Sequence, residues 1–248
     1  MSPEAYVEMS SLQNTHWWFV ARREILQKTI SKLNLPNNAS ILEVGSGTGS
    51  NLSLLAEHGT VLGLEMNQDA IDMATHACQA NTNISMRLGK CPESLDEITQ
   101  RFDLICLFDV LEHIDNDSTS LTRLRSLLKP NGKILITVPA FQWLWSGHDQ
   151  FLHHKRRYTK HTLSTCCNNS RLVIRYISYF NFLLFPLAVL GRLVDRLLQK
   201  KHSSGSAVPS QFINQILRRF FSFESHLLTR FRLPFGLSLL VIAHSGDD

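Results

Sequence analysis

The sequence has few cysteines, and they form no cluster. No C-x-x-C pair occurs, and no group of histidines and cysteines has the spacing of a zinc site. We therefore expect free thiols in a reducing cytosol, with neither a disulfide framework nor a metal site. The five cysteines are Cys78, Cys91, Cys106, Cys166 and Cys167.

Long apolar runs are missing as well. No segment reaches the roughly 18–20 uninterrupted apolar residues of a membrane-spanning helix. The first residues, from Met1 to Glu4, contain no basic segment followed by an apolar one, so no secretory signal is expected. With 44% hydrophobic and 19% charged residues, the 248-residue chain has a globular composition, and its length fits one α/β domain with an elaboration. We expect a cytoplasmic protein.

Acidic residues are scarce in one part of the chain. Between Arg171 and Arg232 there are ten Lys or Arg residues against only Asp195 and Glu224, a local net charge of +8 in a chain whose total is +4. This region is also rich in Phe and Leu. A basic, apolar segment of this kind indicates a surface for a partner.

Apolar runs alternate with helical patterns over residues 40–180. This alternation is typical of βαβ units, with a parallel sheet covered by helices on both faces. Helices are predicted over 67–78 and 116–128. The predicted strands are 40–44, 60–64, 84–88, 102–108, 133–138 and 172–178, followed by a last strand over 236–244.

A glycine-rich turn follows the first predicted strand. Residues 41–49 read Ile-Leu-Glu-Val-Gly-Ser-Gly-Thr-Gly, and Glu65 closes the next apolar run. Glycines let the backbone approach a bound molecule closely because they have no Cβ. An acid at the end of the second strand can accept hydrogen bonds from two ribose hydroxyls. The two features predict a pocket for a nucleoside-bearing cofactor.

The third glycine of a dinucleotide-binding loop is absent, because Ser50 stands at its position. Two further segments follow: Asp109-Val110-Leu111-Glu112-His113 after the fourth strand, and Leu128-Lys129-Pro130-Asn131-Gly132 before the fifth. With the glycine loop and Glu65, they make the chain resemble the class I S-adenosylmethionine-dependent methyltransferases. The resemblance is good over residues 38–160.

The resemblance implies a doubly wound, mostly parallel seven-stranded sheet with an antiparallel last strand. The Rossmann-like domain would comprise residues 38–179 and 232–248. Residues 1–37 would form a helical lid over the pocket or pack on the sheet edge. Residues 180–231 would be a helical insertion between strands six and seven.

S-adenosyl-L-methionine is the cofactor that the resemblance implies. The loop of Gly45, Ser46, Gly47 and Gly49 would pass beneath its methionine part, with Glu43 holding the ammonium group or the loop. Glu65 would hold the ribose and Met66 would cover the adenine. Phe108 and Asp109 would line the sulfur end, while His113 either points into the cleft or caps a helix. Lys90 stands where the family usually places an acid for adenine.

A polar segment after the fifth strand offers groups for proton transfer. His148, Asp149 and His154 are the candidates for taking a proton from an acceptor hydroxyl. Arg156 and Arg157 could bind an anionic group on the acceptor. Alternatively, Asp149 and Arg157 pair with each other and brace the loop.

The insertion has two helical halves, 180–201 and 212–231, joined by a linker over 202–207. Its basic, amphipathic residues 182–231 suit contact with an anionic membrane at the inner surface of the cell. A dimer interface and a cap over the acceptor pocket are the alternatives. A nucleic-acid partner is not expected, because the basic residues are interleaved with Leu and Phe.

We therefore expect a methyltransferase acting on a small or lipid-linked acceptor, most plausibly at oxygen. A glycan, a polyprenyl-linked sugar and a quinone-type molecule all fit. A nicotinamide-dependent oxidoreductase is the second reading, disfavoured by Ser50 and by the absence of a Tyr-x-x-x-Lys pair. A catalytically silent binding protein with the same fold is the third. The sequence names neither the acceptor nor the oligomeric state.

Overall fold

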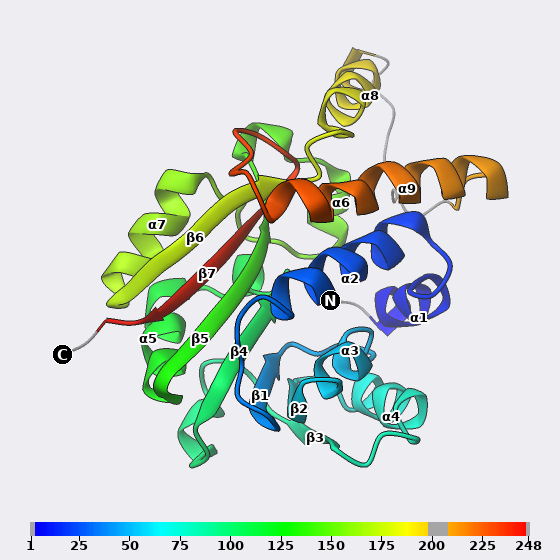
Figure 1. The fold of residues 1–248 in the computed structure, drawn as a ribbon. Coiled ribbons are helices and arrows are strands. Elements are labelled where there is room, and N and C mark those ends of the chain that lie inside the picture. Colours follow the sequence, from blue (N-terminus) through cyan, green and yellow to red (C-terminus); the bar gives the residue numbers. More distant parts are fainter. Residues whose placement is uncertain (1–2, 198–207, 247–248) are drawn as a thin grey trace.

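A seven-stranded sheet forms the centre of the molecule, which a computed structural model describes over residues 3–197 and 208–246 (Figure 1). The strand order is β3-β2-β1-β4-β5-β7-β6. All neighbouring strands are parallel except for β7, which is antiparallel to both β5 and β6. The predicted sheet with an antiparallel last strand is confirmed. The strands are β1 (Ala39–Val44), β2 (Gly59–Glu65), β3 (Ile84–Leu88), β4 (Phe102–Phe108), β5 (Leu128–Pro139), β6 (Leu172–Phe180) and β7 (Ser238–Ser245).

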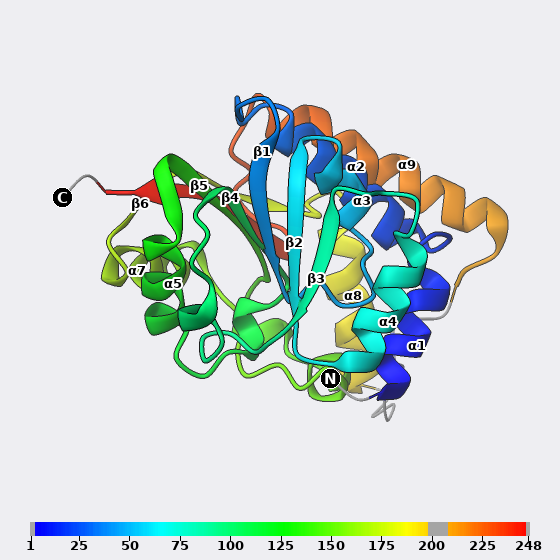
Figure 2. The same ribbon diagram turned by 90° about the horizontal axis from the view of Figure 1, so that it is seen from below.

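Helices cover both faces of the sheet (Figures 1 and 2). On one face lie α5 (Asp117–Ser126) and α7 (Lys160–Asn169), which pack against each other. The other face carries α2 (Trp17–Ile30), α3 (Leu52–Ala56) and α4 (Gln68–Ala77), with α1 (Pro3–Leu12) beside α4. Between β5 and α7 lies the short helix α6 (Gly147–Phe151), and 3-10 turns occur at Leu95–Glu97, Leu111–His113 and Gln142–Leu144.

The central strands are buried on both faces, which explains their nearly continuous apolar sequences. Every residue of β1 is buried between β2 and β4. Because these three strands are parallel, their carboxyl ends meet at one edge of the sheet. This edge brings the glycine loop after β1, Glu65 of β2 and Asp109 after β4 together.

The observed elements differ from the predicted ones mainly at their ends. The strand β5 begins at Leu128 instead of residue 133, because Leu128 pairs with Phe102 across an irregularity in the β4–β5 register. The predicted turn from Lys129 to Gly132 therefore lies within the observed strand β5. The five cysteines are free thiols and are buried.

A helical insertion lies between β6 and β7, as predicted. It contains α8 (Phe185–Leu197) and α9 (Gln211–Leu228), while the predicted linker over 202–207 lies outside the described residues. The helix α9 packs along α2. The rings of Trp17 and Phe221 meet edge to face at 6.0 Å, and the Asn214 side chain accepts a hydrogen bond from the Trp17 amide at 2.9 Å. The insertion is thus joined to the N-terminal helices as well as to the sheet.

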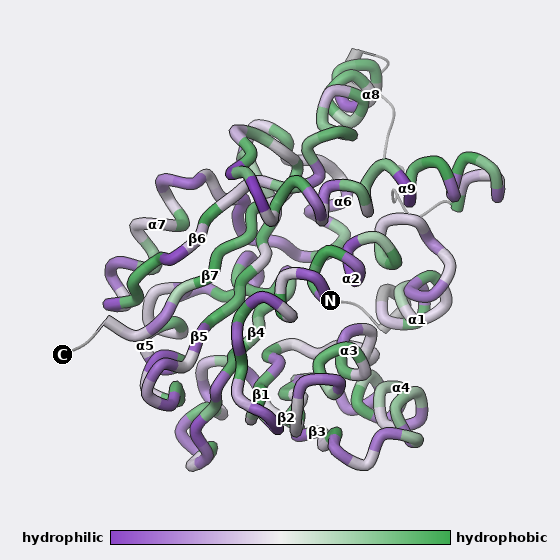
Figure 3. The backbone as a smooth tube through the Cα atoms, in the orientation of Figure 1, coloured by the Kyte–Doolittle hydropathy of each residue, from purple (hydrophilic) through white to green (hydrophobic). Residues whose placement is uncertain are grey.

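Both helices of the insertion also expose large apolar side chains, and Figure 3 shows hydrophobic segments along them. No helix within residues 3–197 and 208–246 combines the length and the apolar character needed to cross a bilayer. The exposed apolar residues are Leu187, Leu190, Leu193 and Val194 on α8, and Phe212, Ile213, Ile216, Phe220 and Phe223 on α9.

Candidate active site

A cavity of about 1390 Å³ opens at the carboxyl ends of β1, β2 and β4. The glycine loop and Glu65 line one part of it, and His113, Trp145 and His154 line another. Leu187 and Gly191 of α8 also contribute to its wall. The first turns of α2 line the cavity, whereas its later residues, such as Ile25, are buried in the core. The helix α2 therefore packs on the sheet with its later residues and lines the cavity with its first turns.

The glycine loop is held in an unusual backbone conformation. The amides of Gly45 and Ser46 donate to the Leu64 carbonyl at 2.7 and 3.2 Å. Gly45 has φ +66°, and a Cβ there would lie 2.6 Å from a methyl group of Val110. Gly47 has φ +53° and lines the cavity, and a Cβ there would meet no protein atom within 4 Å. The loop thus leaves open space directly above its backbone.

Glu65 lies against this loop, and both of its carboxylate oxygens accept hydrogen bonds. One oxygen, Oε2, accepts a hydrogen bond from the Gly47 amide at 2.9 Å. The other, Oε1, accepts from the amides of Met66 and Asn67 at 2.9 and 3.1 Å and from the Tyr6 hydroxyl at 3.0 Å. Burial, together with the nearby Glu65 carboxylate, raises the pKa of Tyr6 far above its usual value. Three backbone amides thus orient the carboxylate, and the Tyr6 hydroxyl reaches it from α1.

Glu43 lies in β1, the strand next to the one that carries Glu65, and it does not reach the cavity wall. Its side chain is buried and accepts a hydrogen bond from Nδ2 of the Asn51 side chain at 2.9 Å. Burial raises the pKa of Glu43 to about 8, against the opposing effect of the Asn51 hydrogen bond. Asn51 itself lines the cavity, so Glu43 contacts the loop region indirectly.

An arginine from α2 neutralises the negative charge of the aspartate that follows β4. Arg22 forms an ion pair with Asp109 at 2.6 Å and donates to Thr137 Oγ1 at 2.9 Å. Its guanidinium also lies 5.1 Å from the ring of Trp18 and 5.6 Å from that of Phe108. The wall beside Phe108 and Asp109 is therefore built from two distant segments of the chain.

Asp149 is completely buried and braces the loop after β5. It pairs with Arg157 through two hydrogen bonds of 2.7 and 2.9 Å, and it accepts the Ser146 amide at 2.8 Å. Its third partner is Nδ1 of His154, at 2.9 Å. Burial opposes ionisation, but the hydrogen bonds from His154 and Arg157 outweigh it and lower the pKa of Asp149. The bracing arrangement considered from the sequence is the one in the structure.

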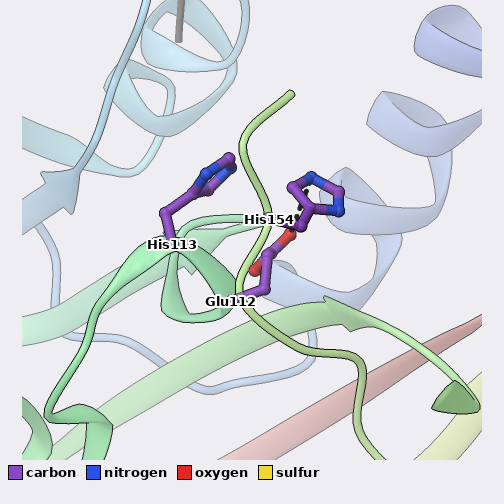
Figure 4. A group of neighbouring side chains, drawn as sticks. All are labelled: Glu112, His113 and His154. Atoms are coloured by element: carbon purple, nitrogen blue, oxygen red, sulfur yellow. Dashed lines mark ion pairs between the residues drawn. The ribbon is translucent and has the colours of Figure 1, made fainter. Parts of the chain in front are cut away.

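Glu112, His113 and His154 meet on the cavity wall (Figure 4). The rings of the two histidines are perpendicular, with their centroids 4.7 Å apart. Within the described part of the chain, neither carboxyl oxygen of Glu112 has a hydrogen-bond partner, although the side chain is completely buried. Burial and the nearby Asp109 charge raise the pKa of Glu112 well above its usual value. Burial, aided by His154, lowers the pKa of His113 to about 4.

The structure brings most of the predicted site residues to one cavity. Glu43, Gly49 and Asp149 are not on its wall: a Cβ at Gly49 would contact Ala74 of α4 at 3.0 Å. The ammonium of Lys90 pairs with Glu93 at 2.9 Å on the surface. Those predicted residues that do line the cavity are Gly45, Ser46, Gly47, Glu65, Met66, Phe108, Asp109, His113, His148 and His154.

Three residues of the site were not predicted from the sequence. Tyr6 and Arg22 come from helices whose place over the cavity no local pattern shows. Glu112 could have been found, because it lies between Asp109 and His113 in a segment already singled out.

Comparisons with known proteins agree with this geometry. A family model described as "Methyltransferase domain" matches residues 18–181, more than half of the chain. A ubiquinone biosynthesis O-methyltransferase of Coxiella burnetii is 34% identical over 100 residues, which cover 40% of this chain and 42% of that protein. The matched region thus spans well under half the length of this curated relative.

Solved structures show the same fold at low sequence identity. A putative sarcosine dimethylglycine methyltransferase from Galdieria sulphuraria has a TM-score of 0.62 and 13% identity, covering 92% of this chain and 87% of that one. An S-adenosylmethionine-dependent methyltransferase from Clostridium acetobutylicum has a TM-score of 0.59 and 12% identity, covering 91% of both chains. Taken with the glycine loop, Glu65 and the sheet order, these matches show that the chain belongs to the S-adenosylmethionine-dependent methyltransferase family.

Proposed function

We propose that the protein transfers the methyl group of S-adenosylmethionine to a hydroxyl oxygen of a small or lipid-linked acceptor. The observation that carries this proposal is one cavity with two kinds of wall. Gly47 and Glu65 lie at one part of it, and the imidazoles of His113, His148 and His154 lie at another. A donor and an acceptor can therefore share the same space.

The residues present fit the cofactor. The open space above Gly47 accommodates a group that approaches the backbone closely. Glu65 already accepts one hydroxyl, that of Tyr6, at a position suited to a ribose hydroxyl. Asn51, Ser46 and the surroundings of Asp109 supply polar contacts for the methionine part.

When bound, the cofactor supplies an activated methyl group on a positively charged sulfur. The chain must hold the acceptor oxygen in line with that group, exclude water and take up the hydroxyl proton. His148 and His154 lie on the cavity wall and can take this proton. Asp149 does not reach the cavity, and its hydrogen bond to Nδ1 orients the His154 ring.

The acceptor side of the cavity is apolar, which suits a hydrophobic acceptor. Leu184, Leu187 and Ala188 contribute to its wall, together with Trp145. The curated relatives named ubiquinone biosynthesis O-methyltransferase support an oxygen as the methylated atom and favour a quinone-type acceptor over a glycan. The nicotinamide alternative gains no support, because the family match and the loop both favour S-adenosylmethionine.

We infer that the acceptor is taken from an anionic lipid surface on the cytoplasmic side of a membrane. Phe212, Ile216 and Phe220 follow one another at helical spacing and form an exposed apolar face of α9. Arg219 and Arg230 are exposed at its borders. An apolar face bordered by positive charge complements lipid tails beneath anionic headgroups. Because α8 lines the cavity, the same insertion would lead the acceptor inward.

Thermal melting with S-adenosylhomocysteine and with NAD tests the donor. A ligand that binds only the folded state at a hundred times its Kd adds about 2.7 kcal/mol to the free energy of unfolding. We expect this stabilisation with S-adenosylhomocysteine and none with NAD. The reverse result would overturn the proposal.

Gly47→Asn is the variant that ties this effect to the loop. Asparagine tolerates the positive φ, its Cβ would meet no protein atom within 4 Å, and its side chain would occupy the open space. The variant should melt close to the wild type when unliganded but lose the stabilisation by S-adenosylhomocysteine. Transfer of a labelled methyl group to membrane extracts then identifies the acceptor.

A further inference from the structure

The cluster of Glu112, His113 and His154 has the makeup of a metal site. Each residue offers one ligand atom, and the three atoms lie within 4.8 Å of one another. The residues come from two segments: the turn after β4, and the loop between α6 and α7. No zinc-type spacing reveals the cluster in the sequence, because only the fold brings residue 154 to residues 112 and 113.

The buried carboxyl group of Glu112 lacks a hydrogen-bond partner among the described residues, and Nε2 of His154 lies 4.0 Å from its Oε1. Both of its oxygens are inaccessible to water and accept no hydrogen bond from the described residues. A buried polar group without a hydrogen-bond partner destabilises the fold, and more so when it is charged. Arg22 and Arg157 lie near enough to affect the pKa of Glu112, but each hydrogen-bonds elsewhere: Arg22 to Thr137 and Arg157 to Asp149. A cation between Glu112 and the histidines would satisfy it.

The outer hydrogen bond of the His154 imidazole matches that of a metal ligand. Nδ1 of His154 is held by the Asp149 carboxylate at 2.9 Å, which directs Nε2 towards Glu112, 4.0 Å from its Oε1. The His113 ring lies against that of His154, with the two ring centroids 4.7 Å apart. A histidine that ligates a metal usually donates its other ring N–H to a carboxylate or a backbone carbonyl. His154 is thus oriented with Nε2 left for the cluster.

We propose that Glu112, His113 and His154 bind one divalent transition-metal ion on the wall of the acceptor cavity. Two imidazoles and one carboxylate favour Mn²⁺, Co²⁺ or Zn²⁺ over Mg²⁺, which prefers oxygen ligands. Three protein ligands leave further coordination positions, and the cavity lies beside them. The site remains accessible to a small molecule.

The role of the ion rests on the proposed methyl transfer. The acceptor hydroxyl oxygen would occupy an open position on the ion, which lowers the pKa of that hydroxyl. The proton would pass to His148, since His154 serves as a ligand. The oxygen then forms a bond to the methyl carbon, while the carbon–sulfur bond breaks and its electron pair stays on sulfur.

Metal binding is tested on the full chain after treatment with a chelator. Equilibrium dialysis against Co²⁺ or Zn²⁺ should give one bound ion per chain, and Mg²⁺ should bind at least tenfold more weakly. Glu112→Gln, His113→Ala and His154→Ala should each weaken Co²⁺ binding tenfold or more. His148→Ala removes an imidazole from the same cavity wall and should keep the full stoichiometry. Absence of bound ion in the wild type, or equal binding by the three variants, overturns the site.

Stabilisation by S-adenosylhomocysteine separates this inference from the proposed function. It should persist in the three variants, which shows that they fold and keep the cofactor pocket. If the wild type itself shows no stabilisation, the proposed function fails independently of the metal. If chelator-treated protein transfers methyl groups as fast as metal-loaded protein, the role assigned to the ion is wrong.

Discussion

The carboxyl group of Glu43 sits inside the first strand with almost no access to water. Its Oε1 accepts a hydrogen bond from the Asn51 side chain, whereas its Oε2 has no hydrogen-bond partner among the residues that the structure describes. Because burial raises its pKa to about 8 in the folded state, the folded protein holds a proton here that the unfolded chain releases near pH 4.5. The stability of the fold is therefore coupled to pH through this residue.

Glu43→Gln should remove this coupling. The contribution of Glu43 is most favourable below about pH 4.5 and decreases as the pH rises to about 8, by up to about 1.4 kcal/mol per pH unit. The difference in free energy of unfolding, variant minus wild type, should thus increase with pH across this window. Urea titrations at several pH values measure it. The exposed Glu57→Gln serves as control, and an equally flat difference for both variants would contradict the assignment.

Tyr6 and Glu65 show how a predicted residue acquires an unpredicted partner. The glycine pattern and the strand end predict where Glu65 lies, because both are local properties of β1 and β2. The Tyr6 hydroxyl reaches it from a helix 59 residues away in sequence. The contact of Arg22 with Asp109 is of the same kind. Such contacts depend on how whole helices pack, which one sequence does not encode in any short pattern.

At the scale of single elements, α9 has apolar side chains on two opposite sides. Phe221 is completely buried against Trp17 and Phe180, whereas its neighbour Phe220 is 55% exposed. If the helix had a single apolar face, the sequence alone would predict which side packs against the rest of the protein. With two such faces, only the structure shows that Phe221 packs inward.

Phe221→Ala and Phe220→Ala form a matched pair that tests this orientation. Loss of the buried ring should lower the free energy of unfolding by about 3–5 kcal/mol, because the cavity left behind adds to the lost burial. Loss of the exposed ring should change it by less than about 1 kcal/mol. Chemical denaturation of both variants gives the comparison. Similar losses for the two would mean that α9 packs differently.

At the scale of the whole molecule, the inferred lipid contact depends on the exposed face of α9. Deleting the insertion would uncover α2, so point substitutions are the better test. Phe220→Ser combined with Phe223→Ser should reduce co-sedimentation with phosphatidylglycerol vesicles severalfold. Wild-type binding should weaken as salt rises, since attraction to anionic headgroups is screened.

The exposed Val173 on β6 provides the control for this measurement. Val173→Ser should sediment with vesicles like the wild type, because it lies outside the insertion. If the double variant also binds vesicles like the wild type, α9 does not contact lipid.

The sheet was the part of the molecule that its sequence predicted best. Strands such as β1 and β4 are buried on both faces, and their continuous apolar runs are hard to mistake. The catalytic side was harder, since Glu112, His113 and His154 meet only after α6 and the following loop fold back across the end of β4. Asp149 was considered both as a base and as a bracing residue, and its burial beside Arg157 favours the second role.

The place of β7 has a consequence for biosynthesis. This strand is the last of the seven in sequence, yet it pairs with β5 on one side and β6 on the other. While a ribosome is still making the insertion, the nascent chain holds β5 and β6 with nothing to join them. Their unpaired edges are then open to other chains, which makes this stage of synthesis prone to aggregation and suited to protection by a chaperone.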